Sequence, residues 1–192
     1  MRRIVVLMVF ALVVAACSDD VPVSTSGAET TTTTAVADST PPTSDEDRIT
    51  VAALAVGALV RDFNTFGSGH RFTEVLIQSR IDPNAGGKGR FTADPGRLLT
   101  VTEKVAIEDA LVDAGPYRWI DDPAEFRTED LLPLIEGSAI IGVGEVVFDL
   151  DGALVPVSLW CGGVCGIWLD LRLVYDGGDW SVVGPEGPMM IS

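Results

Sequence analysis

Apolar residues recur with two different periods along the chain, and the change of period separates a helical part from a strand-rich part. Spacings of three and four follow an acidic start and predict an amphipathic helix over residues 45–67. A second stripe of this kind begins with a capping-box pattern and predicts a helix over residues 100–115, which a Gly-Pro pair ends. Between them, residues 72–79 predict a buried strand, and the glycine- and proline-rich residues 83–95 predict a flexible surface loop.

The second half of the chain consists of apolar runs bounded by turn residues. These runs predict antiparallel strands at residues 139–148, 153–161, 165–175 and 180–184. Residues 117–120 predict a short strand and residues 131–135 a helical turn. Two helices followed by such a meander predict an α+β domain, with the helices packed on one face of an antiparallel meander sheet.

The N-terminus has a different pattern, because Arg2 and Arg3 precede an apolar run over residues 4–14. This arrangement predicts a signal peptide over residues 1–16, since a spanning helix needs roughly 20 apolar residues. Val14-Ala15-Ala16-Cys17 resembles the bacterial lipobox. The resemblance implies cleavage before Cys17 and a diacylglyceryl group on the Cys17 sulfur. This lipid would anchor the chain on the extracytoplasmic face of the cell membrane. An ordinary secretory signal with a chance cysteine is the alternative.

Residues 17–44 follow the expected cleavage site and contain Ser, Thr, Ala, Asp and Pro with few large apolar side chains. Such a segment buries too little apolar surface to offset its ordering entropy, and it predicts a disordered tether that begins at the lipidated cysteine. Residues 45–192 then form one α+β domain.

The charge of the mature chain excludes one large class of partner. Without Arg2 and Arg3, eleven basic residues stand against 28 acidic ones, a formal charge of −17. Nucleic-acid affinity comes from cationic contacts to phosphate, so we expect no nucleic acid among the partners. The membrane is expected as a partner through the lipid, and an envelope protein or a small ligand through the domain. The sequence calls for no cofactor.

Cys161 and Cys165 remain as a pair if Cys17 is lipidated. Placing them opposite each other across a three-residue turn sets Leu159 opposite Ile167, and gives the hairpin one uniformly apolar face. Opposed strand residues lie about 4.5–5.5 Å apart, within disulfide range, so we predict a Cys161–Cys165 disulfide. Pro156 fits this strand poorly, because it removes a ladder donor.

Two other uses of the cysteine pair are weaker. Structural zinc needs four ligands, and His70, the single histidine, is a loop residue that we expect to be solvated. Redox pairs are typically Cys-x-x-Cys at the start of a helix.

Residues 153–166, with the Cys-Gly-Gly-x-Cys-Gly tip, and residues 176–183, with Asp-Gly-Gly-x-Trp-x-Val, carry a second resemblance. They are similar to the C-terminal hairpins of uncharacterised bacterial extracytoplasmic domains, which implies a fold and no activity. The Asp-Gly-Gly-x-Trp ending also resembles cone-shaped domains of the nuclear-transport-factor-2-like kind. This resemblance implies a cone as the alternative fold.

Few residues suggest catalysis. Glu145 lies in phase with apolar residues of its predicted strand, and a carboxylate in apolar surroundings has a raised pKa, as a general acid requires. A hydrolase would need Glu145, Asp170 or Asp149 to converge in one pocket. The segment 149–152 lacks the remaining ligands of a calcium loop and predicts a simple turn.

Trp160 and Trp168 fall close together on the outer face of the predicted hairpin and form a candidate binding platform. Packing under a helix is the alternative. The sequence as a whole favours a lipid-anchored, non-catalytic interaction or envelope-associated module. A small-ligand-binding lipoprotein and a carboxylate-dependent hydrolase are the alternatives, and no metal site is expected.

Overall fold

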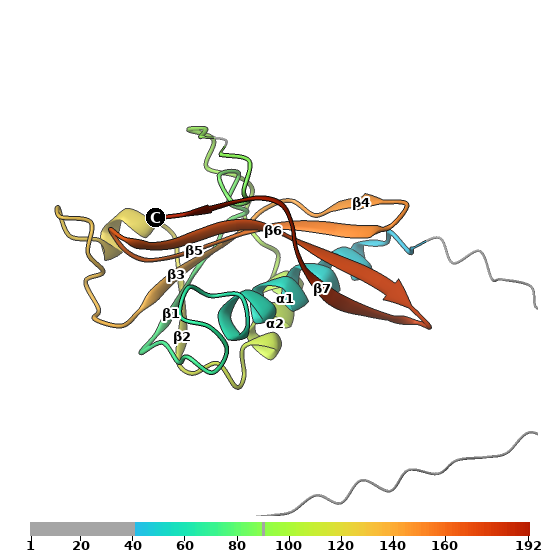
Figure 1. Ribbon diagram of the computed structural model, residues 1–192, viewed down its shortest axis with the longest axis horizontal. Coiled ribbons are helices and arrows are strands. Elements are labelled where there is room, and N and C mark those ends of the chain that lie inside the picture. Colours follow the sequence, from blue (N-terminus) through green and yellow to red (C-terminus); the bar gives the residue numbers. More distant parts are fainter. Residues whose placement is uncertain (1–40, 90) are drawn as a thin grey trace, which may run out of the picture. The chain divides into compact units, whose positions relative to one another are not determined.

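The computed structural model describes residues 41–89 and 91–192, which form two α-helices packed on a mixed seven-stranded sheet (Figure 1). The helical elements are α1 (Asp45–Arg61), α2 (Val101–Ala110) and the short 3₁₀ helix η1 (Pro123–Phe126). The strands are β1 (Val75–Gln78), β2 (Tyr117–Ile120), β3 (Ala139–Val143), β4 (Val147–Asp149), β5 (Gly152–Gly162), β6 (Cys165–Asp176) and β7 (Asp179–Ile191). The predicted signal peptide, Cys17 and the tether up to residue 40 lie outside the described residues. Within the described part, no helix is both long and apolar enough to span a membrane.

Both predicted helices begin where expected, and each begins with a capping box. The Ser44 hydroxyl accepts a hydrogen bond from the Asp47 N–H, and the Thr100 hydroxyl accepts one from Glu103. Capping side chains satisfy N–H groups that have no partner within the helix. The helix α1 ends at Arg61, several residues before the predicted end near Gly67.

The sheet order is β2-β1-β3-β5-β6-β7. The short strand β4 pairs with the first residues of β5, and β3 pairs with later residues of β5. From β3 onward the neighbouring strands are antiparallel, as predicted. The prediction of a purely antiparallel sheet is wrong, because β1 pairs in parallel with both β2 and β3. The helix α2 lies between β1 and β2 in the chain, and a crossover of this kind brings two strands side by side in the same direction.

Three local predictions also differ from the structure. Residues 139–148 form two strands separated at Gly144-Glu145, and β7 continues to Ile191 rather than ending at residue 184. Residues 131–135 contain no helical turn, since Leu131 has a φ of 56°. The loop predicted for residues 83–95 is partly buried at Gly86 and Gly87.

The two faces of the sheet are covered differently. The helices cover one face, and α1 contributes eight buried residues to a core that includes Leu159, Leu169 and Leu171. The segment between β1 and α2, drawn in green in Figure 1, rises on the opposite side of the sheet from the helices. That second face, called the open face below, has only a small apolar cluster, made of Leu76, Ile120, Ile140 and Trp160.

Candidate functional site on the open face of the sheet

The open face is built by alternate residues of the β5–β6 hairpin. The predicted register is confirmed, since Leu159 pairs with Ile167, Ser158 with Trp168, and Trp160 with Gly166. Side chains alternate between the faces of a strand, so Ser158, Trp160 and Trp168 all lie on the open face. The two tryptophans of the predicted platform are therefore brought together.

A loop formed by residues 82–88 lies on this face. Gly86 has a φ of 93°, and a Cβ there would overlap the Asp170 carboxylate. A Cβ on Gly87 would overlap the backbone of Pro188 in β7. The loop therefore approaches the sheet as closely as it does because these two positions carry no side chain. Two cavities, of about 430 and 280 Å³, share Asp82 of this loop in their walls.

The smaller cavity, called the tryptophan cavity below, has aromatic walls. Trp160 and Trp168 line it together with Ile140. Trp160 is 8 % exposed and Trp168 is half-buried. The Cζ atom of Arg127 lies 4.5 Å from the centre of a Trp160 ring, a cation–π contact.

The floor of the tryptophan cavity is polar. The Asp82 carboxylate accepts hydrogen bonds from the Ser158 hydroxyl at 3.1 Å, the Gln78 amide at 3.4 Å and the Asn84 backbone N–H at 2.9 Å. Beneath them lies Gly142, where a Cβ would overlap Asp82 and Ser158 and would lie 2.8 Å from the Gln78 amide nitrogen. The absence of a side chain at Gly142 thus allows three polar side chains from three segments to meet.

Several polar groups around this cavity lack a partner within the protein. The Nε atom of Arg127 is buried without a hydrogen-bond partner among the described residues. Burial lowers the pKa of Arg127, and the nearby charges of Asp82 and Asp122 oppose that effect. In the described part of the chain, neither Trp160 nor Trp168 donates a hydrogen bond from its indole N–H. Buried polar groups are normally paired, so the Arg127 Nε marks an incomplete site.

The mouth of the cavity is formed by Asn84 of this loop and by Phe91 and Thr92, which follow the loop. The Asn84 side chain donates to the Thr92 carbonyl at 3.2 Å and accepts from the Thr92 N–H at 2.7 Å. These two bonds link Asn84 to Thr92. Phe91 lines the cavity and is 84 % exposed, so its ring lies at the entrance.

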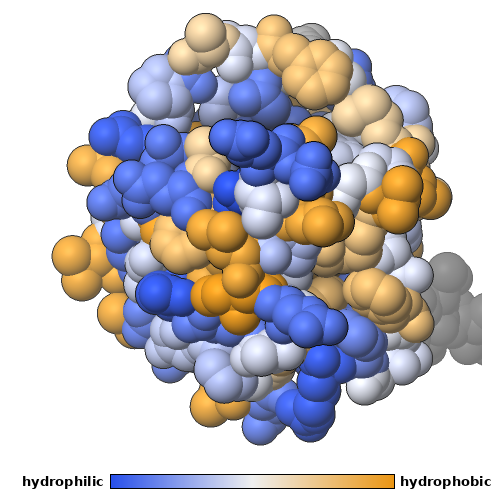
Figure 2. Space-filling model, turned by 90° about the vertical axis from the view of Figure 1, so that its left-hand side faces the viewer, coloured by the Kyte–Doolittle hydropathy of each residue, from blue (hydrophilic) through white to orange (hydrophobic). Residues whose placement is uncertain are grey.

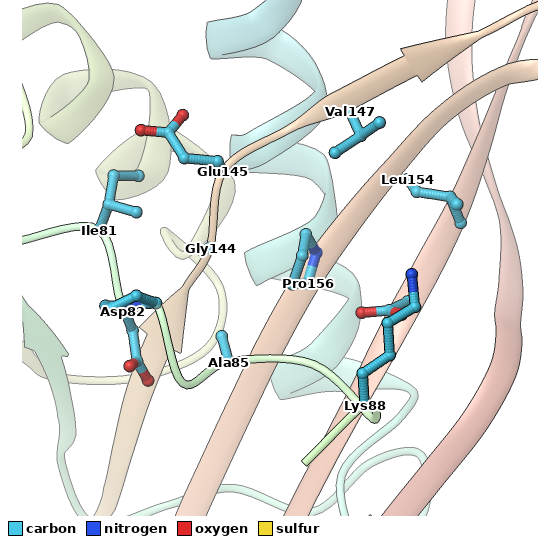
Figure 3. A pocket seen from close by; sticks show the side chains of 11 residues that line it. Ile81, Asp82, Ala85, Lys88, Gly144, Glu145, Val147, Leu154 and Pro156 are labelled. Atoms are coloured by element: carbon cyan, nitrogen blue, oxygen red, sulfur yellow. The ribbon is translucent and has the colours of Figure 1, made fainter. Parts of the chain in front are cut away.

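The larger cavity contains carboxylates that do not form a catalytic pair. Figure 3 shows Glu145 and Asp82 pointing in different directions, with Lys88 on the far side of Pro156 from Glu145. Burial raises the pKa of Asp170, which also lines this cavity, while Lys88 and the Gly87 N–H lower it and Glu186 raises it. A raised pKa is the direction of shift that a general acid needs.

Glu145 does not have the apolar surroundings proposed from the sequence. Its side chain is 54 % exposed and pairs with Arg97 at 3.0 Å, and the same guanidinium binds Glu103 at 2.7 Å. Asp149, the third carboxylate required by the hydrolase interpretation, pairs with Arg172 at 2.8 Å and does not line this cavity. The three carboxylates therefore do not converge.

The Cys161–Cys165 disulfide is present, with Cα atoms 5.0 Å apart. The two cysteines are not directly opposite, as the register argument supposed, because a bulge pairs Gly162 with Cys165. The Thr65 hydroxyl lies 3.4 Å from the Cys165 sulfur, so the hairpin tip contacts the segment that follows α1.

The remaining candidate residues have structural surroundings. His70 stacks on Phe66, with ring centres 4.1 Å apart, and contacts the edge of Phe72, so it is more enclosed than a solvated loop residue. Asp149 accepts the Asp151 N–H at 2.9 Å within the predicted turn. Across residues 41–89 and 91–192, no three His, Cys, Asp or Glu side chains are grouped to hold a metal ion.

Exposed apolar side chains also occur near the end of the hairpin. Leu131, Leu132, Leu134 and Val164 are each more than half exposed. On the face that Figure 2 presents, hydrophobic residues form separate patches among hydrophilic ones rather than one continuous apolar surface. The patches therefore define no docking groove comparable to the tryptophan cavity.

Comparisons of the chain with protein-family models, curated proteins and solved structures find no match. The three resemblances noted in the sequence thus stay predictions, and the interpretation of the site depends on its own geometry.

Proposed function

We propose that this chain is a membrane-anchored extracytoplasmic binding protein whose domain holds a small ligand in the tryptophan cavity. The observation that carries the proposal is Arg127, which lines the cavity with its guanidinium on Trp160 and forms no ion pair with any described carboxylate. Ligand pockets combine apolar and aromatic walls with a few convergent polar groups, and this cavity has both. Of the functions considered from the sequence, small-ligand binding agrees best with this geometry.

The anchoring part of the proposal depends on Arg2-Arg3, the apolar run and Cys17. Two acyl chains hold a protein stably at a membrane, because each buried methylene contributes about 0.8 kcal/mol. We expect Cys17→Ala to release the protein from membranes or to leave its precursor uncleaved. Unchanged processing together with unchanged membrane retention would overturn the anchor.

The binding part is tested with the mature chain carrying Cys17→Ser, which leaves the domain intact without the lipid. Its melting temperature is measured in the presence of monosaccharides, sugar acids, aromatic acids, amino acids and nucleosides. A ligand that binds only the folded state raises the melting temperature with its concentration. We expect at least one class to do so, and Trp168→Ala to abolish the effect.

Trp180→Phe is the matched control, because Trp180 packs on the helix side and does not line the cavity. A ligand effect that Trp168→Ala leaves unchanged would place binding elsewhere. The absence of any effect across the panel would favour the rival interpretation, an interaction module whose partner is an envelope protein.

A further inference from the structure

The tryptophan cavity also indicates which class of small molecule it binds. We propose that the ligand is a pyranose ring carrying a carboxylate, a hexuronic acid unit, either free or as part of an envelope polysaccharide. This inference deepens the binding function proposed above and depends on it. Three properties of the cavity carry it: its size, its partnerless arginine and its set of hydrogen-bonding side chains.

The cavity has room for one ring. Its volume of about 280 Å³ lies just below the roughly 300–1,000 Å³ of pockets that hold drug-sized ligands. Trp160 is almost fully buried under Arg127, so the half-buried Trp168 is the tryptophan with ring surface left for a ligand. A single six-membered ring packed on Trp168 fits this space, whereas a nucleotide exceeds it.

Arg127 favours a ligand that carries an anionic group. It is the only cationic side chain among the described residues that line the cavity. Its guanidinium forms no ion pair with any described carboxylate. A guanidinium stacked on an aromatic ring presents its N–H groups at its edge, where a planar carboxylate accepts two parallel hydrogen bonds. Burial strengthens such bonds because the local dielectric is low.

The polar floor suits hydroxyl groups better than an ammonium group. Asp82 already accepts three hydrogen bonds from the protein, which leaves about one of its four lone-pair sites for a ligand. An ammonium ion needs about three acceptors, so an amino acid is poorly satisfied here. Hydroxyl groups both donate and accept, and Gln78, Asn84 and Ser158 offer both kinds of partner around the ring.

The test compares D-glucuronate with D-glucose, which differ at the carboxylate. Calorimetric titration of the Cys17→Ser chain should show glucuronate binding at least tenfold more tightly than glucose. Arg127→Gln should reduce that ratio to about one, because it removes the guanidinium that binds the carboxylate. Arg48→Gln is the matched control, because Arg48 also stacks on an aromatic ring, that of Phe148, outside the cavity.

The outcomes separate the ligand class from the binding function. Equal affinities for glucuronate and glucose in the parent chain would overturn the role of the carboxylate. Binding of benzoate but of neither sugar would overturn the sugar class and leave the binding function standing. If Arg127→Gln does not fold, Arg127→Lys keeps the charge but not the planar fork, and it should lower the ratio severalfold. Tighter binding of an oligouronate derived from a polysaccharide than of glucuronate would indicate that the natural ligand is part of a polymer.

Discussion

The two faces of the sheet use tryptophan in opposite ways. Trp119 and Trp180 face the helices, and their indole N–H groups donate to Glu108 of α2 at 2.6 Å and to Asp47 of α1 at 3.0 Å. On the open face, the indole N–H groups of the other two tryptophans donate to no described residue. The helix face thus pairs its indole N–H groups within the protein, and the open face leaves its indole N–H groups to water or to a ligand.

The arginines of the open face show the same difference within one surface. Arg172 is almost fully buried, and Asp149 and Glu186 each accept hydrogen bonds from it at 2.8 Å. Arg127, on the tryptophan cavity, has a buried Nε without any such partner among the described residues. A satisfied buried arginine holds β4, β6 and β7 together, whereas an unsatisfied one indicates a ligand.

The largest loss of stability should come from a substitution on the helix face. Leu159 is fully buried there, and Leu159→Ala should lower the free energy of unfolding by about 2–5 kcal/mol in urea titrations. Ser158→Ala, on the other side of the same strand, should cost only about 1 kcal/mol, because it removes one hydrogen bond to Asp82. Equal losses for the two variants would mean that both faces contribute alike to stability.

A glycine on the open face should affect binding more than folding. A Cβ in Gly142→Ala overlaps the ends of the Asp82 and Ser158 side chains, which shift at a cost of about 1–2 kcal/mol. The displaced polar floor should abolish the ligand-dependent rise in melting temperature. Gly163→Ala is the control, because the nearest atom to its Cβ would be 3.7 Å away. Ligand binding that survives Gly142→Ala would place the site elsewhere.

The smallest effect should be a pH-dependent one at Asp170. Burial raises the pKa of this carboxyl, so the folded state holds its proton more tightly than the unfolded state. The folded protein is therefore destabilised as pH rises through the unfolded and then the folded pKa. Asp170→Asn should raise the melting temperature at pH 7 and leave it unchanged near pH 3. A variant that melts lower at pH 7 would show that the charged carboxylate stabilises the fold.

The hairpin was predictable because it is local. Residues 153–175 alternate with a period of two, and a short turn then sets the register that places Trp160 beside Trp168. The capping boxes of both helices were predictable for the same reason. The parallel pairing of β1 was not, because a strand of four residues does not reveal which distant strands flank it.

The polar half of the site had no comparable signal. Asp82, Gln78 and Arg127 come from three segments that meet only in the folded sheet. The one local hint was Ser158, a small polar residue in phase with two tryptophans on an otherwise apolar strand. Nothing in the sequence marks Gly142 as the position that makes room for Asp82.

The most direct test of the account is a nitrogen–proton correlation spectrum of the ¹⁵N-labelled chain, which has four tryptophans. Their indole N–H signals are followed during titration with D-glucuronate and then with the rest of the ligand panel. The account predicts that the signals of Trp160 and Trp168 move together and saturate, while those of Trp119 and Trp180 stay in place. Movement confined to Trp119 and Trp180, or no movement with any compound, would contradict it.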